Sequence, residues 1–77
     1  MLNLYVLKTC PYCAKVVEYL KEQSIDSKIK DIEEHENFDE LMKLGGKEQV
    51  PFLYDDKEDT AMYDSERIIE YLADNYS

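Results

Sequence analysis

Apolar positions in the first half of the chain predict a strand, a helix and a second strand. Residues 2–7 are apolar apart from Asn3, which is typical of a strand buried on both faces. A helix is expected from Pro11, because the next apolar residues recur at the i, i+3, i+4 and i+7 spacing of one helix face. These residues are Cys13, Val16, Val17 and Leu20. Residues 27–32 alternate lysines with Ile29 and Asp31 and predict the second strand.

The middle of the chain predicts a short helix. The segment from Asn37 to Glu40 has the N-x-x-E arrangement of a capping box, which starts a helix at Asn37. Gly45 is suited to end that helix, and Gly46 continues the turn. The residues expected on its buried side are Phe38, Leu41 and Met42.

Two further strands and a last helix are predicted in the remainder. Residues 50–54 and 60–63 are strand-like, and the acidic loop 55–59 between them contains no glycine, so we expect a wide loop. Asp64 or Ser65 can cap the last helix. Its apolar stripe consists of Ile68, Ile69, Leu72 and Tyr76.

The predicted element order is β-α-β-α-β-β-α. Right-handed crossover makes the first two strands parallel, and the later hairpin adds antiparallel strands to the same sheet. We therefore expect an α/β fold with a mixed four-stranded sheet flanked by three helices. A chain of 77 residues allows one domain, 1–77.

Composition and charge exclude several classes of protein. Hydrophobic residues make up 44% and charged residues 35%, as in a soluble globular protein, and no apolar run approaches a membrane span or signal peptide. We expect a cytoplasmic protein that binds no membrane. The net charge of −9 argues against nucleic-acid binding. It is uneven, because residues 1–30 hold five lysines against three acidic residues and the remainder is strongly acidic.

The chemistry is concentrated in Cys10 and Cys13, where the first strand leads into the first helix. Proline is favoured at the first helical position, so Pro11 makes Cys10 the N-cap and Cys13 the third helical residue. The N–H groups of Tyr12 and Cys13 then point at the Cys10 sulfur, as does the positive end of the helix dipole. The pKa of Cys10 should therefore lie below the free value of about 8.5.

Cys13, one turn further along, is expected on the apolar side of the helix. It should stay protonated there, yet near enough to attack a disulfide formed at Cys10. The alternatives are two core cysteines or a metal site. An N-cap sulfur is not a core position, and one C-x-x-C with the single histidine His35 does not complete a zinc site, so no metal is expected.

Cys10-Pro11-Tyr12-Cys13 is identical to the active-site motif of dithiol glutaredoxins, and the whole chain resembles that family. Val50-Pro51 matches the family's Val-Pro, whose peptide bond is cis. The resemblance implies a thioredoxin-like fold and a glutathione-dependent thiol–disulfide oxidoreductase. It implies no bound cofactor, with glutathione as reducing co-substrate and disulfide-containing or glutathionylated proteins as partners of a monomer.

The resemblance also assigns glutathione-binding residues. The Val50 backbone would pair with the cysteine residue of glutathione by strand addition. Its γ-glutamyl end would lie at the start of the last helix, where the helix N-terminus attracts a carboxylate. The implied binding residues are Lys8, Tyr12, Gln49, Val50, Pro51, Asp64 and Ser65. The other six tyrosines are expected in the core and rim.

The sequence departs from the glutaredoxin pattern in two places. Residues 63–72 are more similar to the acidic-Ser segment of glutathione transferase N-terminal domains, and Lys8 lies two residues before Cys10, where the family lysine lies three before. Three alternatives stay open: a small electron donor reduced by thioredoxin reductase, a binder of an iron–sulfur cluster through Cys10 and glutathione, and a transferase fragment.

Overall fold

One mixed sheet organises the computed structural model, which describes residues 1–76. Its strand order is β2-β1-β3-β4, with β1 and β2 parallel and the β1–β3 and β3–β4 pairs antiparallel. The predicted element order and the thioredoxin-like fold are confirmed. The elements are β1 (Leu2–Val6), α1 (Pro11–Glu22), β2 (Ser27–Asp31), α2 (His35–Leu44), β3 (Phe52–Asp55), β4 (Thr60–Tyr63) and α3 (Ser65–Tyr76).

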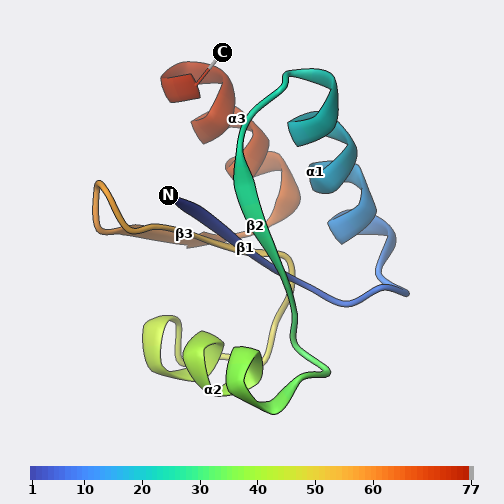
Figure 1. The fold of residues 1–77 in the computed structure, drawn as a ribbon, viewed down its shortest axis with the longest axis vertical. Helices are drawn as coiled ribbons and strands as arrows, with labels where there is room; N and C mark the ends of the chain where they lie inside the picture. Colours follow the sequence, from blue (N-terminus) through green and yellow to red (C-terminus); the bar gives the residue numbers. More distant parts are fainter. Residues whose placement is uncertain (77) are drawn as a thin grey trace.

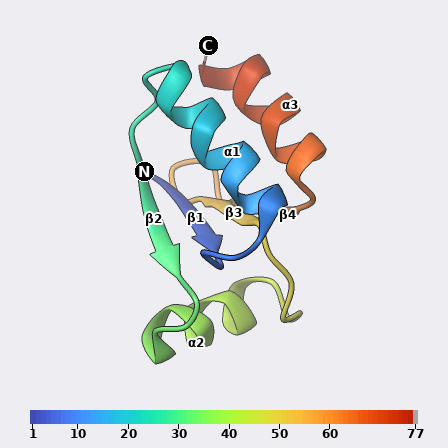
Figure 2. The ribbon, with the colours of Figure 1, turned by 90° about the vertical axis from the view of Figure 1, so that its right-hand side faces the viewer.

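Helices α1 and α3 cover one face of the sheet and α2 covers the other (Figure 1, Figure 2). Every residue of β1 is buried, as predicted for a strand with both faces covered. Leu4 of β1 belongs to the cluster under α1 and α3, whereas its neighbour Tyr5 belongs to the cluster under α2. Successive side chains of a strand point to opposite faces, so one strand supplies both cores.

The predicted capping box at the start of α2 is wrong. The helix begins at His35 with Glu34 as N-cap. The Asn37 amide donates instead to the Asp31 carbonyl oxygen at 2.9 Å and to the Glu34 carboxylate at 3.3 Å. Glu40 accepts hydrogen bonds from outside its own helix, so the two residues do not act as a reciprocal pair. Met42, expected to be buried, is exposed.

The end of β3 also differs from the prediction. Residue 55 was expected in the acidic loop, but it is the last residue of β3 and is fully buried. The Asp55 carboxylate accepts hydrogen bonds from the Tyr71 hydroxyl at 2.7 Å and the Tyr76 hydroxyl at 2.5 Å, and a third from the Lys57 N–H. This carboxylate therefore ties the β3–β4 hairpin to the last turns of α3.

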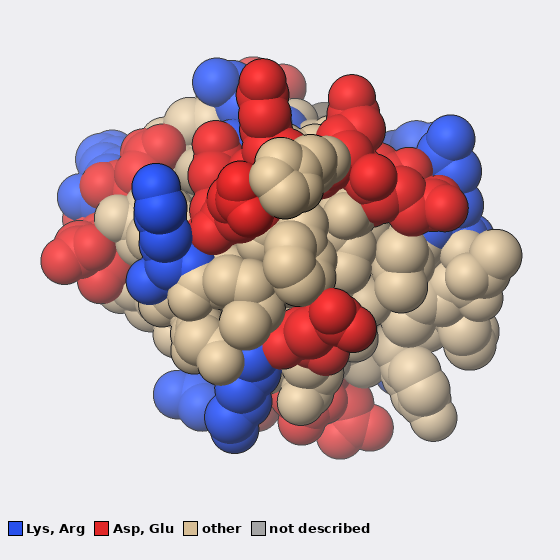
Figure 3. Space-filling view, turned by 90° about the horizontal axis from the view of Figure 1, so that it is seen from below, with Lys and Arg blue, Asp and Glu red and all other residues tan. Residues whose placement is uncertain are grey.

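The acidic composition is visible on the surface. Figure 3, from the side of α2, shows several groups of Asp and Glu side chains on this face, with uncharged side chains and some Lys or Arg side chains between them. Within residues 1–76, no helix combines the length and apolar character needed to cross a membrane.

Candidate active site

The two cysteines lie where the sequence places them, at the start of α1. Cys10 is the N-cap in an extended backbone conformation, and Pro11 is the first helical residue. The Cys10 N–H donates to the Leu7 carbonyl oxygen at 3.1 Å, and the Cys10 carbonyl oxygen accepts from the Ala14 N–H at 3.1 Å. Backbone bonds on both sides therefore hold the Cys10 backbone in place.

The Cys10 thiol is partly exposed and has a lowered pKa. Partial burial raises this pKa, but the N–H and thiol of Cys13 and the N–H of Tyr12 outweigh it because they stabilise the thiolate. The Cys10 sulfur does not accept a hydrogen bond that caps the start of α1. The N–H groups of Cys13 and Tyr12 therefore lower the pKa of Cys10 because they lie close to its thiolate.

Cys13 has the opposite environment. It is 1% exposed within the cluster that includes Leu4, Val16 and Ile68. Burial raises the pKa of Cys13 to about 12, and the neighbouring Cys10 sulfur adds to the rise. The two thiols thus differ in the direction that the sequence predicts, with one stabilised as an anion and the other kept protonated.

Six of the seven predicted glutathione-binding residues meet in one open groove of about 290 Å³. The groove lies beside the start of α1, and we call it the site groove. Its lining residues are Tyr12, Gln49, Val50, Pro51, Asp64 and Ser65. Tyr12 is 64% exposed, so its aromatic ring is accessible to a ligand in the groove.

The Val50–Pro51 segment forms one wall of the site groove. Its peptide bond is cis, as the family resemblance implies. Within residues 1–76, neither the N–H nor the carbonyl oxygen of Val50 has a hydrogen-bond partner. These two groups are therefore free to pair with an extended peptide.

The other wall is the junction between β4 and α3. Asp64 has a φ of 79°, in the left-handed region that aspartate tolerates better than most residues. Its carboxylate accepts from the Glu66 N–H at 3.2 Å and its carbonyl oxygen accepts from the Ile68 N–H at 3.0 Å, so it caps α3 as predicted. Ser65 follows at the positive end of the helix dipole. This wall thus combines a carboxylate with a helix N-terminus.

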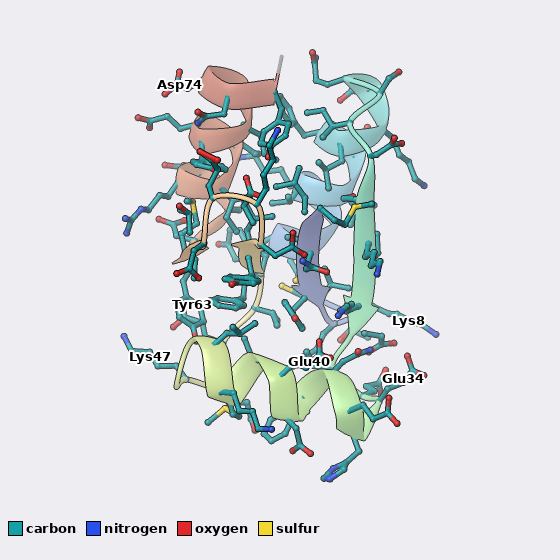
Figure 4. The ribbon with its side chains drawn as sticks, turned by 60° about the vertical axis from the view of Figure 1, so that its left-hand side comes forward. Lys8, Glu34, Glu40, Lys47, Tyr63 and Asp74 are labelled. Atoms are coloured by element: carbon teal, nitrogen blue, oxygen red, sulfur yellow. The ribbon has the colours of Figure 1, made fainter. Side chains whose placement is uncertain are left out.

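Lys8 is not brought to the site groove. Its ammonium lies 3.8 Å from the Asp31 carboxylate, and its side chain is 80% exposed. It borders a different, more apolar groove of about 470 Å³, which Cys13, Val17 and Ile29 also line. Figure 4 shows Lys8 on the β2 side of the molecule, away from Lys47 and Tyr63. Its role as a ligand residue stays a prediction.

No group of three or more His, Cys, Asp and Glu side chains within residues 1–76 is arranged to hold a metal ion. One neighbour of the site groove was not singled out from the sequence. Tyr63 immediately precedes Asp64, and its hydroxyl bonds to the loop that carries Gln49. Its place next to a predicted site residue was the only sequence signal for it.

Comparison with solved structures finds the same fold in glutathione transferases. An Omega 3C transferase from Trametes versicolor has a TM-score of 0.85 and 25% identity, over 97% of this chain and 33% of its own. A transferase from Drosophila melanogaster has a TM-score of 0.80 and 30% identity, over 100% and 35%. One from Phanerochaete chrysosporium, solved with oxidized glutathione, has a TM-score of 0.78 and 28% identity, over 97% and 36%.

The chain thus spans about a third of the length of these neighbours. No curated protein matches it. Residues 4–77 match the family model described as the glutathione S-transferase N-terminal domain. This match supports the similarity seen in residues 63–72 and does not single out the glutaredoxins. The chain belongs to the glutathione S-transferase N-terminal domain family.

Proposed function

We propose that this chain is a glutathione-dependent thiol–disulfide oxidoreductase that uses Cys10 and Cys13. The observation that carries the proposal is the opposite pKa shift of two thiols that flank Tyr12, a residue that lines the site groove. A thiolate is the nucleophile in disulfide exchange, and a protonated second thiol can resolve the product. In this proposal residues 1–77 act as one domain and as a monomer in the cytoplasm.

The exchange proceeds in two balanced steps. The Cys10 thiolate attacks the glutathionyl sulfur of a mixed disulfide, so that a Cys10–glutathione disulfide forms and the target leaves as a thiolate. A second glutathione thiolate then attacks that disulfide, which yields oxidised glutathione and regenerates Cys10. With a protein disulfide, the Cys10 thiolate attacks one sulfur and forms a mixed disulfide, and the other target sulfur leaves as a thiolate. The Cys13 thiol then attacks the Cys10 sulfur and its proton goes to the departing target, which is released as a dithiol while a Cys10–Cys13 disulfide forms. Two glutathione molecules reduce that disulfide and leave as oxidised glutathione.

The site groove has groups suited to each part of glutathione. The free Val50 backbone pairs with the cysteine residue, next to Pro51. The Asp64 carboxylate binds the ammonium of the γ-glutamyl end, and Ser65 with the α3 N-terminus binds its carboxylate. Gln49 lies in the groove and serves the glycyl carboxylate, with Tyr12 alongside. The neighbour solved with oxidized glutathione supports this ligand class.

The proposal is tested by thiol reactivity and by two serine variants. Iodoacetamide should alkylate Cys10 at a rate that levels off below pH of about 8.5, the midpoint for a free thiol. Cys10→Ser should abolish reduction of a glutathionylated peptide, whereas Cys13→Ser should retain it and lose reduction of protein disulfides. Equal loss of both activities in Cys13→Ser would contradict the assignment. Titrating the oxidised protein with glutathione and with thioredoxin reductase identifies the electron donor.

The family match favours a second candidate, a transferase domain that conjugates glutathione to an electrophile. In that reaction the glutathione sulfur attacks the electrophilic carbon, chloride leaves when the substrate is a chlorinated aromatic, and the thiol proton goes to solvent. The thiols of the protein are neither oxidised nor reduced. The Cys10→Ser variant separates the two functions. Conjugation of a chlorinated aromatic substrate that survives Cys10→Ser, together with absent disulfide reduction in the wild type, would favour the transferase.

A further inference from the structure

The Tyr63 hydroxyl makes two hydrogen bonds to one distant residue. It accepts from the Lys47 N–H at 3.1 Å and donates to the Lys47 carbonyl oxygen at 2.9 Å. Lys47 lies in the loop between α2 and β3, sixteen positions before Tyr63. Figure 4 shows the Tyr63 ring next to the end of α2, on the same side of the molecule as Lys47. The contact therefore joins the end of β4 to that loop.

The ring that carries this hydroxyl is held in place by its neighbours. It packs on Phe52 with ring centroids 4.7 Å apart. A Cβ atom at Gly45 would lie 2.8 Å from the Tyr63 ring carbon that bears the hydroxyl and 3.0 Å from Phe52. Only glycine leaves room for the ring at that point, so the end of α2 accommodates Tyr63.

Lys47 transmits the contact to the site groove. Its carbonyl oxygen accepts a second hydrogen bond, from the Gln49 N–H at 2.9 Å. Gln49 and the following Val50 form one wall of the groove, and Asp64, the residue after Tyr63, belongs to the other. One side chain thus connects the two chain segments that form the walls of the groove.

We infer that Tyr63 is a positioning residue that sets the separation of these two walls and so the affinity for glutathione. This inference rests on the proposed function for its ligand. Tyr63 does not line the groove, and its hydroxyl bonds to Lys47 alone. Its effect is therefore on binding geometry and leaves the reactivity of Cys10 unchanged.

Tyr63→Phe tests the inference because it keeps the ring and removes both hydrogen bonds. We expect the KM for glutathione to rise roughly three- to tenfold, with kcat and the alkylation pKa of Cys10 unchanged. Tyr54→Phe is the matched control, since its hydroxyl bonds to Asp59 in the β3–β4 loop.

Hydrogen exchange provides a readout that needs no ligand. The Lys47 and Gln49 amides should exchange faster in Tyr63→Phe and at the wild-type rate in Tyr54→Phe. Unchanged exchange or unchanged glutathione affinity in Tyr63→Phe would overturn the inference, and so would an equal affinity loss in Tyr54→Phe. A wild type that neither binds glutathione nor reduces its mixed disulfides would instead defeat the proposed function, and amide exchange alone would then decide the role of Tyr63.

Discussion

The two faces of the sheet are covered in different ways. Within residues 1–76, the face under α1 and α3 encloses a cluster of ten buried residues, whereas the face under α2 encloses four: Tyr5, Ile32, Leu41 and Phe52. Apolar burial scales with the area removed from water, so the first face supplies most of the packing energy. The position of α2 depends more on individual polar contacts.

These polar contacts hold α2 and the loop after it at two places. Glu40 of α2 accepts from the Lys30 ammonium at 2.7 Å and from the Tyr5 hydroxyl at 2.9 Å. Tyr63 holds the loop after α2 through Lys47. The site groove takes one wall from each part, because Gln49 follows α2 and the other wall begins α3. The site groove thus lies between a firmly packed part of the molecule and a part held by a few hydrogen bonds.

The largest expected difference between the faces is in core truncation. Leu72 of α3 and Leu41 of α2 are both fully buried. Truncation costs depend on how far the site can collapse, and α2 has fewer packed neighbours to hold a cavity open. Leu72→Ala should cost about 4 kcal/mol and Leu41→Ala about 2 kcal/mol of the free energy of unfolding, measured in urea. An equal or reversed cost would contradict the comparison.

A smaller effect is expected at the buried carboxylate on the α3 side. Asp55→Asn replaces a charged acceptor of two tyrosine hydroxyls by a neutral one, which should cost about 2 kcal/mol. The pKa of Tyr71, which burial and Asp55 raise to about 12, should fall in an absorbance titration. Asp59→Asn is the control, because Asp59 lies in the exposed loop and accepts from Tyr54. A comparable loss of stability in the control would contradict the special role of Asp55.

The pH dependence of stability should follow Asp55 more than Glu40. Burial raises the pKa of Asp55, but the Tyr76 and Tyr71 hydroxyls outweigh it; Lys30 and then Tyr5 lower that of Glu40. Each depressed pKa gives stability that is present above the unfolded values of about 3.9 and 4.3 and is lost as pH falls through the folded value.

Glu40 is 45% exposed, so solvent screens most of its share. The acid loss of stability below pH of about 4 should therefore become shallower in Asp55→Asn and change little in Glu40→Gln. Urea unfolding at a series of pH values measures it, and an unaltered slope in Asp55→Asn would refute the assignment.

The smallest effect is a local one on α2. Glu40→Gln should change the free energy of unfolding by less than about 1 kcal/mol, because the ion pair with Lys30 is partly exposed. Amides of α2 should nevertheless exchange faster while those of α1 and α3 keep their rates. Glu18→Gln removes the same charge from the exposed surface of α1 and should alter neither set. Faster exchange throughout would show that α2 is not a separately held element.

What the sequence predicted well depends on short-range order. Pro11 and the apolar spacing after it place Cys10 at the N-cap and Cys13 inside, because helix geometry relates residues three and four apart. The opposite pKa shifts follow from that placement. The capping box failed because Glu40 bonds to Lys30 and Tyr5, which reach α2 from the sheet and are not its neighbours in sequence.

By itself, then, the sequence determined the element order, the two thiol environments and the residues that resemble a glutathione site. Only the tertiary structure decided which of them meet. It gathers six around one groove, leaves Lys8 beside Asp31, buries Asp55 under two tyrosines and joins Tyr63 to Lys47. These contacts span residues far apart in the chain, and their formation depends on strand register and helix packing, which no local pattern encodes.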